Sequence, residues 1–131
     1  MSEGFGNRIQ AIRDAYVTKL VARGAFVAEW SRVSEEIILP VLHLARQNLT
    51  LRNLTLKIEG GNGSDIVAVV HTTPIGKDVK KLCYHPQPDE GMIMVASGGT
   101  PTGFPLDMIS TDLVESHVEA YLREALRLGG E

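Results

Sequence analysis

The chain has 131 residues, of which 44% are hydrophobic and 22% charged, and its formal net charge is −3. A chain of this length and composition can bury enough surface to fold as one domain, residues 1–131, without a disulfide or a structural metal. A mean hydropathy of +0.01 and the lack of an apolar run near twenty residues exclude a conventional membrane span. The acidic balance also disfavours a dedicated nucleic-acid-binding protein.

The N-terminal residues "MSEGFGNRIQ" lack the basic stretch and apolar block of a secretory signal. Cys83 is the one cysteine of the chain, so no intrachain disulfide can form. These two features predict a cytoplasmic protein. Charge is unevenly distributed, because residues 87–131 carry two basic and eight acidic side chains, a net of −6. This segment is typical of a solvated acidic helix face, or of a surface that meets a basic partner.

Two helices are predicted at the N-terminal end. Apolar residues recur at helical spacing from Arg8 to Val33, and they include Tyr16, Phe26 and Trp30, which we interpret as core anchors. Ser34 is a good N-cap residue for a second helix, which we expect to extend to Asn48. Pro40 removes one backbone hydrogen bond from it, so the chain should kink between residues 34 and 40.

Four strands and one helix are predicted to follow. Apolar and polar residues alternate in residues 54–59, and residues 65–72, 79–85 and 92–97 are rich in β-formers. Short turns at 60–64, 73–78 and 86–91 join the four segments into an antiparallel meander. A final helix begins at Ser110, Thr111 or Asp112 and is ended by Gly129 and Gly130. The predicted fold class is α+β: two N-terminal helices, a four-stranded antiparallel β-meander and one C-terminal helix.

Residues 65–72 and 92–97 are apolar on both faces of their strands. The helices must therefore divide between the two faces of the sheet, or a second subunit must cover one face. Symmetric dimers are the commonest small assemblies, which favours a homodimer. The long N-terminal helix is the other candidate interface.

The stretch "SGGTPTGFP", residues 97–105, lies between the last strand and the final helix. That order suits a phosphate-binding loop, whose backbone N–H groups converge at a helix N-terminus. Pro101 and Pro105 lack N–H groups, however, and no P-loop or dinucleotide-binding spacing is present. The stretch is predicted to be a crossover loop that borders any pocket or interface of the sheet.

Three other residues have side chains that can bind a metal ion. Cys83 and His85 point to one side of a strand, and His71 ends a predicted neighbouring strand, so the three could hold zinc. No zinc-binding spacing supports this interpretation, and we predict neither a metal nor a cofactor.

The lysines of "GKDVKK", with Arg52 and Lys57, could form a patch for nucleic acid, but stacking aromatics are too few. Lysines also protect strands from edge-to-edge pairing, which is the favoured interpretation.

No coherent catalytic set is present, so the sequence favours a non-enzymatic binding or assembly module. We expect it to form a homodimer and to recognise a protein partner or a small ligand, with no membrane or nucleic-acid partner. The alternative is a small enzyme or ligand-binding protein with a pocket between the helices and the sheet. Residues 97–104 would border this pocket, and Met92 and Met94 could line it. The candidate binding residues are His71, Cys83, His85, Ser97, Gly98, Gly99, Thr100, Thr102, Gly103 and Phe104.

Overall fold

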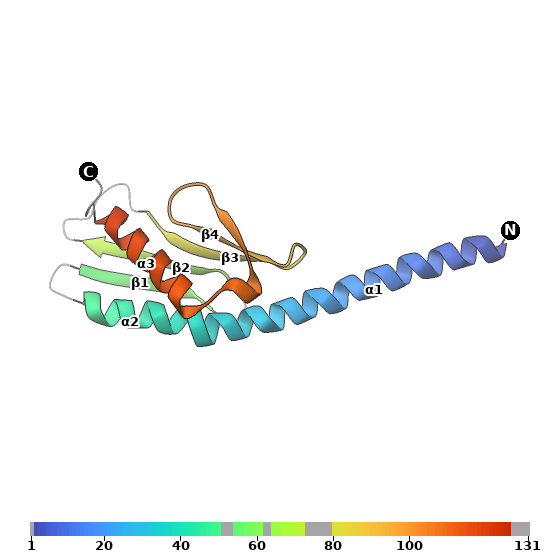
Figure 1. The fold of residues 1–131 in the computed structure, drawn as a ribbon, viewed down its shortest axis with the longest axis horizontal. Helices are drawn as coiled ribbons and strands as arrows, with labels where there is room; N and C mark the ends of the chain where they lie inside the picture. The colour runs from blue at the N-terminus through green and yellow to red at the C-terminus, as the bar shows by residue number, and fades with distance from the viewer. Residues whose placement is uncertain (1, 51–53, 62–63, 73–79, 127–131) are drawn as a thin grey trace.

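The computed structural model describes residues 2–50, 54–61, 64–72 and 80–126, and it has an α+β fold (Figure 1). The helical elements are α1 (Ser2–Val33), a π-helical turn (Ser34–Ile38), α2 (Leu39–Leu49), a 3-10 turn (Leu106–Met108) and α3 (Thr111–Ala125). The strands are β1 (Leu54–Gly60), β2 (Ile66–Thr72), β3 (Leu82–Gln87), β4 (Met92–Ala96) and β5 (Thr102–Pro105). The predicted turns at 60–64 and 73–78 lie wholly or partly outside the described residues, as do Gly129 and Gly130.

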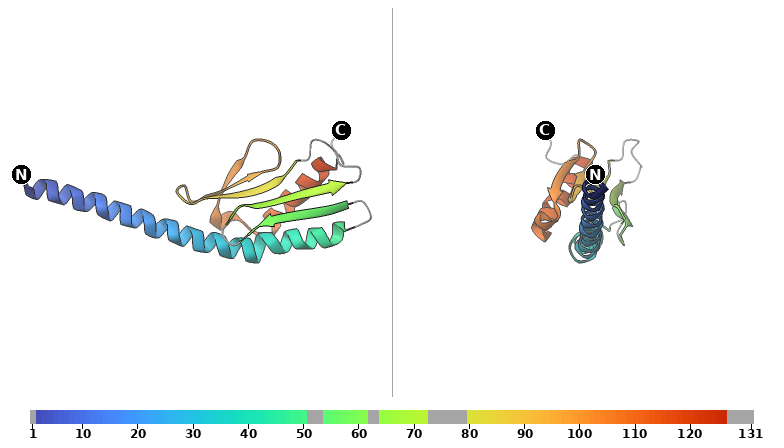
Figure 2. Two further views of the ribbon diagram at one scale, coloured as in Figure 1. Left: turned by 180° about the vertical axis from the view of Figure 1, so that it is seen from behind. Right: turned by 90° about the vertical axis from the view of Figure 1, so that its right-hand side faces the viewer.

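Residues 2–49 form one continuous helical run rather than two helices with a break. Ser34 does not cap a second helix, because its Oγ donates a hydrogen bond back to the carbonyl oxygen of Ser31 at 2.9 Å. The π-helical turn ends two residues before Pro40. Pro40 stands in the first turn after it, where a missing N–H is tolerated. The helix continues through residues 34–40 by a local widening at the π-helical turn, and its direction changes where α1 passes into α2 (Figure 2).

The sheet has five antiparallel strands in the order β1-β2-β3-β4-β5, one more than the four predicted. The additional strand, β5, lies within the stretch that was expected to be a crossover loop. It pairs with β4, with Thr102 opposite Val95 and Phe104 opposite Ile93. An edge strand needs few ladder hydrogen bonds, so it accommodates Gly103 and Pro105, which made this segment look irregular.

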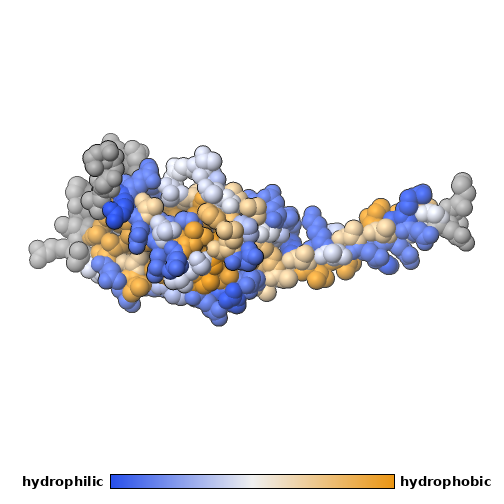
Figure 3. Space-filling view, in the orientation of Figure 1, coloured by the Kyte–Doolittle hydropathy of each residue, from blue (hydrophilic) through white to orange (hydrophobic). Residues whose placement is uncertain are grey.

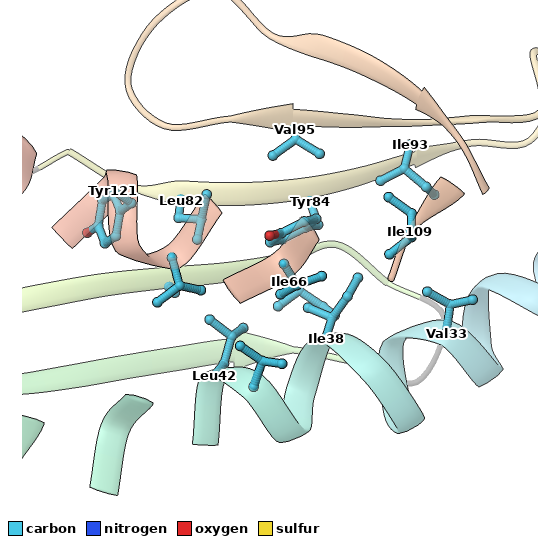
Figure 4. Packing of buried hydrophobic residues seen from close by; sticks show 14 of the residues in the cluster. Val33, Ile38, Leu42, Ile66, Leu82, Tyr84, Ile93, Val95, Ile109 and Tyr121 are labelled. Atoms are coloured by element: carbon cyan, nitrogen blue, oxygen red, sulfur yellow. The ribbon is translucent and has the colours of Figure 1, made fainter. Parts of the chain in front are cut away.

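All helices that contact the sheet lie on one of its faces. α3 is in front of the sheet in Figure 1 and behind it in the reversed view of Figure 2, and α2 runs beside β1. The core forms between these helices and the inner face of the sheet (Figure 4), and its largest fully buried side chains include Trp30, Tyr84 and Tyr121. The other face of the sheet, hereafter the outer face, is covered by no described element.

A side chain of α3 completes the hydrogen bonding of the sheet. β2 and β3 pair only from Ile66 opposite Tyr84 to Ala68 opposite Leu82. Beyond these pairs, the hydroxyl of Tyr121 accepts a hydrogen bond from the N–H of Val70 at 3.0 Å and donates one to the carbonyl oxygen of Lys80 at 2.7 Å. One phenol thus satisfies two backbone groups that would otherwise lack partners.

α3 begins at the first of the three predicted cap residues. The side chain of Ser110 accepts a hydrogen bond from the N–H of Leu113 at 3.2 Å. Val114, Val118 and Tyr121 then bury one face of the helix against the core. This local arrangement places His117, one turn from Tyr121, beside the ring of Tyr84.

Candidate functional site

The first candidate site is the part of α1 that extends beyond the rest of the molecule (Figures 1 and 2). Every residue from Gly4 to Ala25 is exposed, and the first buried side chain after them is Phe26. Tyr16, predicted to be a core anchor, is 61% exposed, whereas Phe26 and Trp30 are buried as predicted. At about 1.5 Å per residue, this projecting segment is roughly 30 Å long.

The projecting segment carries an apolar stripe along one side. It consists of Phe5, Ile9, Ile12, Tyr16 and Leu20, hereafter the α1 stripe. Steps of three and four residues keep these positions within one side of a helix with 3.6 residues per turn. Their exposed fractions run from 47% to 65%. Figure 3 shows apolar atoms at the surface along this helix, with nothing packed over them.

Little else holds the projecting segment to the molecule. Arg23 pairs with Asp89 of the β3–β4 turn, with its Nη1 3.1 Å from Oδ1, but both side chains are more than half exposed. An exposed ion pair of this kind contributes at most about 1 kcal/mol to stability. Helices in proteins gain most of their stability from packing an apolar face. The α1 stripe is therefore an apolar surface that no described residue covers.

The second candidate site is the outer face of the sheet. Its half-exposed apolar residues come from three strands and are Val67, Val69, Cys83, Met92, Met94 and Ala96. None of them packs against the core. A Cβ atom added to Gly103 would come within 2.7 Å of Met92 Cε and 3.2 Å of Met94 Sδ, so the two methionines fold over this glycine. The prediction that Met92 and Met94 line a pocket between the helices and the sheet is therefore wrong, because both lie on the outer face.

The predicted group of His71, Cys83 and His85 lies on this outer face but does not converge. Cys83 of β3 stands opposite Val67 of β2. His71 is four residues further along β2 than Val67, which places it roughly 13 Å from Val67 at about 3.3 Å per residue. Nδ1 of His85 instead lies 2.8 Å from Oδ1 of Asp65. Burial, followed by the charge of Asp65, raises the pKa of the Cys83 thiol and so makes it less reactive. Within the described ranges, no three metal-ligating side chains could hold a metal ion.

The third candidate site is a small pocket beneath the glycine-rich stretch. Its volume is about 170 Å³, and it is partly open to solvent. Five of the predicted residues line it, together with four from β3, β4 and α3: Ser97, Gly99, Thr100, Thr102, Phe104, Leu82, Val95, His117 and Ala120. The other two predicted glycines, Gly98 and Gly103, are not part of this lining. A Cβ atom added to Gly98 would meet the side chain of Lys80, and Gly103 lies under the two methionines of the outer face. The pocket is formed by α3 and the β4–β5 side of the sheet, not by the long helix.

His117 is the functional candidate that the sequence did not indicate. Its Nδ1 lies 3.1 Å from the hydroxyl of Tyr84, and its ring packs against Phe104 with the centroids 5.3 Å apart. Burial lowers the pKa of His117, which keeps the ring neutral at pH 7. The only sequence signal was its position one residue before Val118 on an amphipathic helix, which does not distinguish it from a solvated histidine.

Two lysines of the predicted basic patch, Lys57 and Lys80, are paired with acidic side chains. Nζ of Lys57 is 3.0 Å from Oε1 of Glu59, and Lys80 pairs with Glu124 of the acidic helix α3. Arg52 and Lys77 lie outside the described residues. The acidic C-terminal segment thus meets a lysine of the same chain in at least one place.

Comparisons with known proteins do not place the chain in a family. No protein-family model matches it, and neither does any curated protein or solved structure. In the part of the chain that the structure describes, no helix is both long and apolar enough to cross a membrane. The candidate sites therefore have to be judged on their geometry.

Proposed function

We propose that this protein is a non-enzymatic assembly module that forms a homodimer through the α1 stripe. The observation that carries the proposal is the exposure of five large apolar side chains on a projecting helix, over which none of the described residues packs. Fully burying a side chain of this kind contributes roughly 1.5–3 kcal/mol. In a symmetric dimer, each of these side chains is buried on both subunits, so its contribution to the free energy of association is made twice.

The spacing of the stripe suits a second copy in antiparallel orientation. If the twofold axis passes between the levels of Ile12 and Arg13, Phe5 lies opposite Leu20 and Ile9 lies opposite Tyr16. The two copies of Ile12 then lie side by side at the axis, offset along it by about 1.5 Å. All five positions of the stripe are then matched by an apolar side chain. A single self-complementary surface of this kind is what a twofold dimer requires.

Charge also favours the antiparallel orientation. Residues 4–28 carry four basic side chains and one acidic side chain, a net of +3. A parallel pair in register would place Arg8, Lys19 and Arg23 each beside the same residue of its partner, which is unfavourable. In the antiparallel pair, Arg8 lies opposite Val17 and Lys19 opposite Gly6, so the like charges are separated.

The outer face of the sheet is the weaker candidate for self-association. Its apolar side chains are only half exposed, and Met92 and Met94 already pack over Gly103. An exposed ion pair, Lys57 with Glu59, borders the same face, as does the pair of His85 with Asp65. Charged side chains of this kind limit unplanned association of sheets.

The test changes one residue of the stripe and one on the other side of the helix. Ile12→Glu places two carboxylates together at the centre of the proposed dimer. Gln10→Glu adds the same charge about 160° away around the helix. Light scattering after size-exclusion chromatography should give a dimer for the unchanged chain and for Gln10→Glu, and a monomer for Ile12→Glu.

Near-ultraviolet circular dichroism of Trp30, which is 1% exposed, reports whether the folded body is intact in each variant. A dimer that persists in Ile12→Glu would contradict the proposed surface. So would an equal loss of dimer in both variants, because it would show that charge rather than the stripe is responsible.

A further inference from the structure

The pocket beneath the glycine-rich stretch combines an apolar floor with a polar rim. Leu82 and Val95 form the floor and are 1% and 7% exposed. Ser97, Thr100 and Thr102 contribute three hydroxyl groups to the lining. None of these hydroxyls has a hydrogen-bond partner among residues 2–50, 54–61, 64–72 and 80–126, so all three are available to a ligand.

The hydrogen bond between Tyr84 and His117 determines which ring nitrogen carries the proton. Tyr84 is fully buried, and within the described residues its hydroxyl has no acceptor other than Nδ1 of His117. The phenol must therefore donate its proton to Nδ1. Burial raises the pKa of Tyr84, so the phenol keeps this proton at neutral pH. A neutral His117 then carries its own proton on Nε2, the nitrogen not engaged by Tyr84.

We propose that this pocket binds a small monocarboxylate through the Nε2–H of His117 and the hydroxyls of Ser97, Thr100 and Thr102. The lining contains several groups that can donate hydrogen bonds and no carboxylate. A carboxylate accepts several such bonds at once, whereas an amide oxygen accepts fewer and an ammonium accepts none. This site is separate from the α1 stripe, and the proposal does not depend on the dimer.

The size of the pocket limits the length of the ligand. With a share of roughly 30 Å³ per water-sized unit, 170 Å³ holds about six non-hydrogen atoms. Butyrate has that size, and its alkyl chain matches the floor formed by Leu82 and Val95. Butanamide and butylamine have the same shape without the negative charge, so they serve as matched probes.

The test is a titration followed by the ring signals of His117 in nuclear magnetic resonance spectra. Butyrate should shift these signals in a saturable way at constant pH and ionic strength, and butanamide and butylamine should not. Thr102→Val removes one hydroxyl of the pocket and should weaken butyrate binding roughly tenfold, as expected for a hydrogen bond to a charged group. Thr55→Val makes the same change on the outer face and should leave the affinity unchanged.

Three results would overturn the proposal. The first is the absence of a saturable shift with butyrate, and the second is equal binding of butanamide. The third is equal butyrate affinity in the Thr102→Val and Thr55→Val variants. Thr102 lies exposed on the edge strand β5, so its replacement by another β-branched residue should leave the fold intact.

Discussion

Tyr121 shows how one side chain can complete the main-chain hydrogen bonding of a sheet. Its hydroxyl joins the N–H of Val70 to the carbonyl oxygen of Lys80 where β2 and β3 no longer pair. The side chain is 1% exposed, so water cannot replace the hydroxyl easily. Its partners are backbone groups, and the bond therefore depends on the path of the chain rather than on another side chain.

Tyr121→Phe should lower the free energy of unfolding by about 1–3 kcal/mol, because it leaves a buried donor and a buried acceptor without partners. Urea denaturation at a fixed protein concentration measures this change. Thr55→Val is the control, since it also removes a single hydroxyl but at an exposed position of the outer face; we expect a change within about 0.5 kcal/mol. Equal stability of the two variants would show that the Tyr121 hydroxyl is not needed.

Chemistry-bearing residues were only partly predictable from the sequence. The glycine-rich stretch was expected to border a pocket, and Ser97, Gly99, Thr100, Thr102 and Phe104 do line one. His117 was missed because one histidine on an amphipathic helix has no spacing that marks it. Cys83 and His71 were grouped on an assumed strand register, and the real register separates them.

At the scale of elements, periodicity predicted most of the fold. Strict alternation in residues 54–59 and the apolar stripe of α3 placed these elements correctly. β5 escaped prediction because a four-residue edge strand containing Gly103 and Pro105 has no recognisable period. The continuous N-terminal helix was missed because Ser34 is a good N-cap residue and Pro40 normally kinks a helix. A π-helical turn at Ser34–Ile38 instead continues the helix, and Pro40 stands in the first turn after it.

The orientation of the two α1 helices can be tested by cross-linking at single positions. In the antiparallel pair, Ile12→Cys lies at the twofold axis beside its own copy, whereas Phe5→Cys is roughly 20 Å from its copy at about 1.5 Å per residue. Under mild oxidation, Ile12→Cys should form a disulfide-linked dimer and Phe5→Cys should not. Both variants need Cys83→Ser, to remove the native thiol. Efficient cross-linking of both would indicate a parallel pair instead.

At the scale of the whole molecule, two unequal parts are joined at Phe26. The body has a closed core between the helices and the inner face of the sheet, and the projecting part of α1 has no core at all (Figures 1 and 4). An amphipathic pattern in a sequence shows that a helix has an apolar face. It does not show whether the same chain or another one covers that face. This is why Tyr16 was wrongly predicted to be a core residue.

The most direct test of self-association through α1 is the mass of the unmodified chain by sedimentation equilibrium. One chain has a mass of 14.3 kDa. We expect a reversible equilibrium that approaches twice this mass as the concentration rises through the micromolar range. A mass of one chain throughout that range would contradict the account, because the α1 stripe would then remain exposed to water.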